Sequence, residues 1–411
     1  MKNKSWLFIL GMVMAGLLTV ACDNGNSSII PIVTLTPTIT INDANLTVTV
    51  SVGGTATGAV TLNTTALPAA VTASISGTKI TVTGIRPTTK VPPITGSFIV
   101  GVTREGVTQD LTVEVNLTTT WVSLFEMVSI PAGTFTMGSP DATNPPAEKG
   151  RYTNETQWQV ILSSFYMGAF QVTQEQWAVV MEGNTNDINT TPSNFHGGSG
   201  LEPAAGEVQA KRPVEQVSWY DVLVFCNRLS TIEGLNPAYK ISGSTNPNDW
   251  GTAPTSDNAE WDAVEIVAGS TGYRLPTEAQ WEYACRAGTM TAFNNGEQDW
   301  ENQVTLYPID WFDFNSSNMT HEVGRKTANA WGLYDMHGNV HEWCWDWYAA
   351  VYPSGTQTDP QGASSGTYRV LRSGSWYVPA QLGRSASRSY TFPSDLGGNL
   401  GFRLVRPGAA H

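Results

Sequence analysis

Hydrophobic and polar positions follow two different patterns along the chain, and the change comes near residue 120. Between residues 29 and 118, short runs of alternating apolar and polar residues are separated by turns with Gly, Pro or Asn. These runs lie at 46–52, 79–85, 97–102 and 110–117. A period of two is typical of half-buried β-strands. Several short strands at this spacing predict an all-β, immunoglobulin-like sandwich over residues 29–118.

From residue 121 onward the chain is rich in Trp, Tyr and Phe, and helix signals appear. Thr173, Ser218 and Thr277 each precede, by three residues, a Gln or Asp that can return the capping hydrogen bond. This spacing predicts three helix starts. The helix after Ser218 carries a stripe of apolar residues at core spacing, which favours packing over a cofactor site: Val222, Phe225, Cys226, Leu229 and Ile232.

The N-terminus has the pattern of an export signal. Lys2 and Lys4 precede an apolar run from residue 6 to residue 21, and small residues lead to Cys22. We interpret residues 1–21 as a lipoprotein signal peptide, with lipid attached to Cys22 and residues 22–28 as a tether. The alternative is a transmembrane anchor, but the apolar run is just short of a normal span. The expected location is the cell envelope, at its outer surface, with the first domain holding the second off the membrane.

Composition excludes one class of partner. The 411 residues carry 22 basic and 35 acidic side chains, a net charge of −13, so nucleic acid is not an expected partner. After Cys22 only Cys226, Cys285 and Cys344 remain, which permits at most one internal disulfide. Cys226 and Cys285 fall in predicted helices, where a buried free thiol is the favoured state.

Several motifs occur in one order over residues 122–407 and together resemble the sulfatase-modifying-factor family, whose best-known members are formylglycine-generating enzymes. They are MVSIPAGTFTMGS (127–139), FYMGAFQVTQEQW (165–177), RPVEQVSWYDVLVFCNRLS (212–230), YRLPTEAQWEYACRAG (273–288), GLYDMHGNVHEWCWDWY (332–348) and the closing GSW and GFRL. The resemblance implies an α+β, C-type-lectin-like fold for residues 122–407.

The enzymes of that family carry two cysteines shortly after a GGSY-like motif, where they bind copper and activate oxygen. Here Gly374-Ser375-Trp376-Tyr377 is followed by Val378 and Pro379, and no Cys occurs after Cys344. The soft ligands for copper are absent from that place. We therefore expect no formylglycine-generating activity. The alternative is an exported oxygenase of the same family that uses non-haem iron or copper.

Residues 369–404 combine a fixed-looking frame of Gly, Ser, Trp and Arg with residues that follow neither a helical nor a strand period. In this respect the chain resembles the variable proteins of diversity-generating retroelements, which include a lipoprotein of Treponema. In such proteins errors in copying a template alter scattered codons within a constant frame. The alternative is an ordinary static loop. The candidate ligand-binding residues are Trp376, Tyr377, Val378, Gln381, Leu382, Ser387, Ser389, Tyr390, Phe392 and Asp395, and the expected ligand is a protein or glycan at the cell surface.

The stretch from Asp335 to Glu342 is the best candidate for a metal site. Two carboxylates with backbone carbonyls between them can surround a hard cation with oxygens. The family resemblance implies a structural Ca²⁺ bound by Asp335, the carbonyls of Gly338 and Val340, and Glu342. The alternative is a turn held by the two acidic residues without metal. His337 and His341 are four apart, but a Gly and a β-branched residue between them argue against a zinc-binding helix.

Two more patterns indicate architecture. Trp343, Trp345 and Trp347 alternate, and a buried sheet face is the commoner explanation than a sugar-binding platform. The motif from Arg274 to Glu278 predicts a helix start and a charge pair. The sequence as a whole favours a surface lipoprotein that displays a ligand-binding face on a calcium-braced scaffold.

Overall fold

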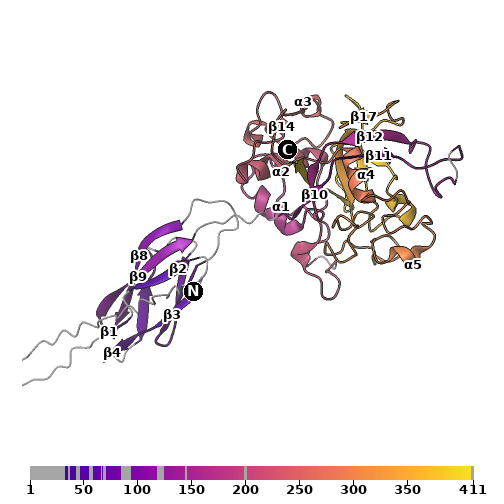
Figure 1. The fold of residues 1–411 in the computed structure, drawn as a ribbon. Helices are drawn as coiled ribbons and strands as arrows, with labels where there is room; N and C mark the ends of the chain where they lie inside the picture. Colours follow the sequence, from indigo (N-terminus) through magenta and orange to yellow (C-terminus); the bar gives the residue numbers. More distant parts are fainter. Residues whose placement is uncertain are drawn as a thin grey trace, which may run out of the picture. The chain divides into compact units, whose positions relative to one another are not determined.

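The computed structural model describes residues 33–35, 38–42, 47–54, 59–65, 67, 71–84, 94–117, 125–143, 146–198 and 201–408. The predicted signal peptide, the tether and Cys22 lie outside these residues. The chain divides into two compact units, Met1–Arg86 with Pro92–Thr118 and Pro87–Val91 with Thr119–His411 (Figure 1). No helix in the described ranges is both long and apolar enough to cross a membrane.

In the residues that the structure describes, the first unit consists of β-strands and turns. One sheet has the order β2 (Thr38–Asn42), β9 (Val107–Leu117), β8 (Ile94–Arg104), β5 (Val60–Asn63), and the other has β3 (Thr47–Ser51), β7 (Lys79–Gly84), β6 (Val71–Ser76). A short pair joins β1 (Val33–Thr34) to β4 (Gly53–Gly54). Glu105 and Gly106 both have positive φ, which is the backbone that a two-residue hairpin loop between β8 and β9 requires. Alternate residues of the two sheets share one core that includes Ile80, Val82, Val100, Val102, Leu111 and Val113.

The second unit mixes helices with short strands (Figure 1). In its described residues these strands form four small sheets. One sheet has the order β10 (Met127–Ile130), β13 (Phe165–Gly168), β21 (Val405–Pro407), and a second has β11 (Gly133–Met137), β12 (Trp158–Leu162), β17 (Gln357–Thr358). A pair joins β14 (Tyr239–Lys240) to β15 (Glu265–Ile266). The fourth sheet has the order β19 (Ser389–Thr391), β18 (Arg369–Arg372), β16 (His341–Trp347), β20 (Leu400–Gly401).

The three predicted helix starts are confirmed. Thr173, Ser218 and Thr277 are the N-caps of α1 (Gln174–Met181), α2 (Trp219–Ile232) and α4 (Glu278–Arg286), and each forms a complete capping box. The predicted stripe of α2 faces the core, with Ile232 packed at its margin. The remaining helical segments are short: α3 (Ala259–Asp262), α5 (Gln303–Leu306), and 3₁₀ turns at Gln209–Lys211, Pro247–Asp249 and Ala380–Gly383.

Strand β16 is buried along its whole length because two cores meet on it. Trp343 and Trp345 join the core that contains α2, and Cys344, on the other face, joins the core that contains α4. The candidate segment follows from this placement, since β18 and β19 extend the same sheet and β20 pairs with the first residues of β16. The Gly, Ser, Trp and Arg frame of residues 369–404 is thus anchored to a strand that is buried along its whole length.

Candidate functional site

Four arginines of the candidate segment lie buried and bind distant carboxylates, among them Arg403 with Glu342. Arg372 contacts Glu282 of α4, and Arg384 binds both oxygens of Glu155. Arg388 makes a bidentate pair with Glu278, at 2.6 and 2.8 Å. Buried bidentate pairs of this kind fix position and orientation as well as charge. The backbone of the segment is therefore held at several points along its length.

Three aromatic side chains of the segment point to solvent. Tyr377 is 65% exposed, Tyr390 45% and Phe392 38%. Tyr390 stacks on Tyr348 with ring centroids 4.0 Å apart, and Tyr368 lies 5.0 Å from Tyr390 and 4.7 Å from Phe392. We call Tyr348, Tyr368, Tyr390 and Phe392 the tyrosine cluster. The sequence interpretation missed two of its members, and the only signal for Tyr348 was its position at the end of the WCWDWY run.

A second aromatic group surrounds the start of the segment. Trp376 is half-buried, packs edge-on against Phe195 at 5.0 Å, and donates its indole N–H to the carbonyl of Gly398 at 2.8 Å. Tyr377 lies against Trp376 with ring centroids 5.2 Å apart. Trp376 is thus held by packing and a hydrogen bond beneath the surface, while the neighbouring Tyr377 ring is exposed and can contact a ligand.

Ser387 is not exposed as predicted, and several other candidate residues are less available to a ligand than expected. Ser387 is only 4% exposed, because its carbonyl accepts a hydrogen bond from buried Arg372 and turns the residue inward. Asp395 accepts hydrogen bonds from the Thr391 hydroxyl and the Phe392 N–H, so it closes a turn. Four more candidates are half-buried, and one of them, Gln381, donates to the Gly150 carbonyl at 2.9 Å. They are Val378, Gln381, Leu382 and Ser389.

The oxygens of the predicted calcium motif converge on one point. Carbonyls of Asp335, Gly338 and Val340 and a carboxylate oxygen of Glu342 all lie within hydrogen-bond distance of the Gln171 amide nitrogen. The Asp335 carboxylate accepts a hydrogen bond from Gly324, and burial raises its pKa to about 6. Asp335 has a φ of 55°, in the left-handed region that few residues other than Gly adopt. No local sequence pattern indicated that Gln171 would join this group.

Histidines do not gather at the motif. His337 Nδ1 lies 2.7 Å from the Gly383 carbonyl and His341 Nδ1 lies 3.0 Å from the Ser373 carbonyl, so the two rings serve different loops. Burial lowers the pKa of both rings, which keeps them neutral. Within the described ranges, no three side chains of His, Cys, Asp or Glu are grouped as metal ligands.

The alternating tryptophans are buried, as predicted. Trp343 is fully buried, and the Arg369 guanidinium lies 3.4 Å from the ring centroid of Trp347 and 3.6 Å from that of Trp219. These ring faces are covered by the protein's own cation and cannot form a sugar platform. Cys226, Cys285 and Cys344 are buried free thiols. Burial raises the pKa of Cys285 to about 12, so it is not a reactive thiolate.

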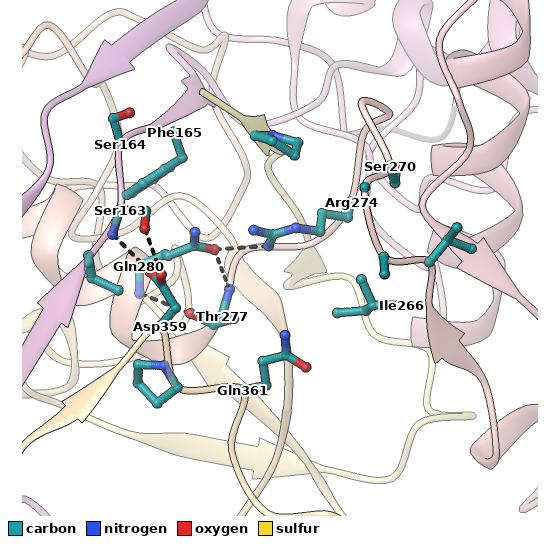
Figure 2. Close-up of a pocket in the computed structure, with 16 residues that line it drawn as sticks. Ser163, Ser164, Phe165, Ile266, Ser270, Arg274, Thr277, Gln280, Asp359 and Gln361 are labelled. Atoms are coloured by element: carbon teal, nitrogen blue, oxygen red, sulfur yellow. Dashed lines mark hydrogen bonds between the residues drawn. The ribbon is translucent and has the colours of Figure 1, made fainter. Parts of the chain in front are cut away.

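A pocket of about 310 Å³ with both polar and apolar walls lies apart from the candidate segment, since none of its lining residues belongs to residues 369–404. Figure 2 shows Arg274 and Gln280 pointing toward each other in this pocket, with Asp359 next to Ser163. The predicted charge pair between Arg274 and Glu278 is wrong. Arg274 instead bonds the capping glutamine Gln280 at 2.9 Å, because Glu278 is bound by Arg388.

Sequence and structure comparisons identify the family to which this chain belongs. The chain is 35% identical over 261 residues to "Chaperone protein LppX" of Paenibacillus barcinonensis, covering 60% of this chain and 81% of that protein. It is 29% identical to the formylglycine-generating enzyme of Thermomonospora curvata, covering 68% of this chain and 92% of the enzyme. The solved structure "Treponema denticola variable protein 1" superposes with a TM-score of 0.60 at 37% identity, covering 69% of this chain and 95% of that one. Residues 114–407 match the sulfatase-modifying factor enzyme 1-like domain, and the chain therefore belongs to the formylglycine-generating-enzyme and sulfatase-modifying-factor family.

Proposed function

We propose that this protein is a lipid-anchored envelope protein whose second unit, of C-type-lectin-like fold, displays a ligand-binding face at the outer surface. One observation carries the proposal. Tyr377, Tyr390 and Phe392 are exposed on a segment whose frame is buried and held by ion pairs. Exposed tyrosines give a large contact area at low entropic cost and often dominate recognition. The ligand is a protein or a glycan at the cell surface.

A cavity beside the tyrosine cluster extends the proposed face. It has a volume of about 330 Å³, and Trp158, Trp347 and Tyr352 are among its walls. Arg388 lines it and lies 4.9 Å from the ring centroid of Tyr348, on which Tyr390 stacks. Concave, mostly apolar sites with a few polar groups are the usual form of ligand pockets. The stacked rings and the cavity therefore give the face both a flat and a concave part.

The similarity to Treponema denticola variable protein 1 supports a further element of the proposal, that residues 369–404 are diversified by a retroelement. The test is genomic. A nearby reverse transcriptase gene and a near-copy of the 3′ coding end that differs at adenines would support diversification, and a locus with neither would contradict it. The first unit, proposed to be an immunoglobulin-like sandwich, would serve as the spacer between the lipid at Cys22 and the binding unit.

The binding face is tested by replacing Tyr377, Tyr390 and Phe392 together with Ala. Wild type and variant are compared on one glycan array and one display library of surface-protein fragments. A matched control replaces Tyr152 and Phe314, which are also exposed but lie outside the segment. We expect the triple variant to lose ligands that the wild type and the control retain, with little change in melting temperature. Equal binding by all three proteins would contradict the proposed face.

A further inference from the structure

The Gln171 side chain lies where four oxygens converge. Gln171 follows β13 and stands two residues before the N-cap of α1. Its Nε2 is 3.2, 3.0 and 3.1 Å from the carbonyl oxygens of Asp335, Gly338 and Val340, and 3.0 Å from Glu342 Oε1. We call these four atoms the oxygen cage. All five residues are buried.

The hydrogen bonds at the oxygen cage leave two oxygens of its residues without a donor. A carboxamide nitrogen carries two hydrogens, so it can make good hydrogen bonds to only two of the four cage oxygens. The others have further donors, since Arg403 donates to Glu342 Oε1 and the Ser373 hydroxyl donates to the Gly338 carbonyl. Gln171 Oε1 and Asp335 Oδ1, which belong to two residues of the cage, are buried without any hydrogen-bond partner. Buried polar atoms that lack partners are costly, so these two oxygens favour a bound donor or cation.

A hard cation would serve the two unpartnered oxygens. The cage residues carry these two besides the four cage oxygens, six in all, and Ca²⁺ takes roughly 6–8 oxygen ligands. The carboxylates of Asp335 and Glu342 supply negative charge for it. Arg403 donates to both oxygens of Glu342, at 2.6 and 2.8 Å, and opposes the cation in part. The residues present thus fit a bound calcium ion, provided that the Gln171 nitrogen leaves the cage.

We propose that Gln171 serves both states of this site: its amide nitrogen fills the oxygen cage without metal, and the amide turns to present Oε1 as a ligand when Ca²⁺ binds. A carboxamide suits both states because it has a donor and an acceptor at one end. A carboxylate at this position would have no hydrogen to give the empty cage. Gln171 is therefore a calcium ligand that also stabilises the metal-free fold.

The location of the oxygen cage links it to the candidate segment. The Gly338 carbonyl also accepts from the Ser373 hydroxyl at 3.3 Å, and the Asn339 carbonyl accepts from the Trp376 N–H at 2.9 Å. Between them, Gly374 N–H donates to the His337 carbonyl at 3.3 Å. The turn that forms the cage thus holds the residues from which Tyr377 projects. Calcium at this site would stiffen the start of the segment.

Gln171→Glu and Gln171→Met separate the two roles. The mature chain is studied by calorimetric titration with CaCl₂ and by thermal melting in EDTA or excess CaCl₂. We expect Ca²⁺ to bind wild type and raise its melting temperature. Gln171→Glu should melt earlier in EDTA and gain more from Ca²⁺ than wild type. Gln171→Met should bind Ca²⁺ more weakly, by roughly 10- to 100-fold, the loss typical of a damaged metal site.

Amide NMR gives a second readout that a passive structural role would not move. The Gln171 side-chain NH₂ signals, assigned by their loss in Gln171→Met, should shift when Ca²⁺ is added. Gln174→Met is the matched control, because that amide donates to the Phe195 and Pro213 carbonyls and not to the cage. Absence of Ca²⁺ binding to wild type would overturn the proposal and leave the amide as a permanent filler. Binding with no shift of the Gln171 amide, or with unchanged affinity in Gln171→Met, would overturn the role of Gln171.

Discussion

Replacing Arg384 with Met should destabilise the second unit strongly. The Arg384 side chain is fully buried, and its guanidinium donates to Glu155 at 2.7 and 2.9 Å, to Glu148, and through Nε to the Gln381 carbonyl at 2.9 Å. Methionine has a similar length but leaves two buried carboxylates without their cation. Breaking a buried pair from one side costs about 3–5 kcal/mol. We expect a loss of unfolding free energy of that size.

Protonation should reduce this cost at low pH. Burial raises the pKa of Glu148, and the Arg384 guanidinium opposes that rise. Without Arg384 the pKa of Glu148 should rise further, so a neutral carboxyl becomes available as the pH falls. The deficit of Arg384→Met relative to wild type should therefore be smaller at pH 5 than at pH 8. Adding Glu148→Gln and Glu155→Gln to Arg384→Met should recover part of the stability, because the uncompensated charges are gone.

Tryptophan fluorescence in a urea titration is the appropriate assay. Apart from Trp6 in the predicted signal peptide, every Trp lies at or beyond residue 121, so the signal reports on the second unit. Lys149→Met is the matched control, since Lys149 pairs with Asp299 and Glu301 in an exposed position. Exposed pairs contribute little, and this variant should unfold like wild type. If Arg384→Met is no less stable than Lys149→Met, the proposed anchoring of the segment by buried ion pairs is refuted.

Three more predictions concern pH, chemistry and the anchor. Burial raises the pKa of Glu215 to about 7 despite N–H donors from Asn194 and Phe195. The folded state then holds a proton that the unfolded state releases, so stability should fall by up to about 3 kcal/mol as the pH rises from 4.5 to 7. Glu215→Gln should flatten this slope in urea titrations, and an identical slope would contradict the assignment. Incubation with copper, oxygen and a sulfatase-derived Cys peptide should leave the peptide mass unchanged, whereas formylglycine production would disprove the binding-protein proposal. Palmitate should label wild type and not Cys22→Ala; labelling of both would rule out the lipoprotein assignment.

Local features of the fold were predictable from sequence, and long-range ones were not. The capping boxes at Thr173, Ser218 and Thr277 depend on residues three positions apart, so the sequence alone determines them. The oxygens of the Asp335 to Glu342 turn are also close in sequence, and their convergence was expected. Gln171 lies 164 residues before Asp335 in the chain, and no local sequence pattern connects the two. Its place in the cage required the packing of β13 against the rest of the unit.

The same distinction explains the errors within the candidate segment. Irregular spacing indicated that residues 369–404 form no regular element, but it could not tell which side chains face inward. Ser387 is buried, and its carbonyl binds Arg372 of β18, a contact that no local sequence pattern indicates. Tyr348 and Tyr368 were missed because they join Tyr390 only after β16 and β18 have paired. Which side chains of such a segment are exposed depends on the tertiary contacts that surround each of them.

Those contacts suggest how one segment can combine rigidity with freedom to change. Its arginines bind carboxylates that lie elsewhere in the chain: Arg372 reaches Glu282, Arg384 reaches Glu155 and Arg388 reaches Glu278. The backbone is therefore positioned by residues whose side chains point inward. The rings of Tyr377, Tyr390 and Phe392 are exposed and bury less of their own surface. Substitutions away from buried contacts usually change stability by no more than about 0.5 kcal/mol. The cost of altering the exposed residues should thus fall on ligand recognition and not on folding, which is the division of roles that a diversified binding face requires.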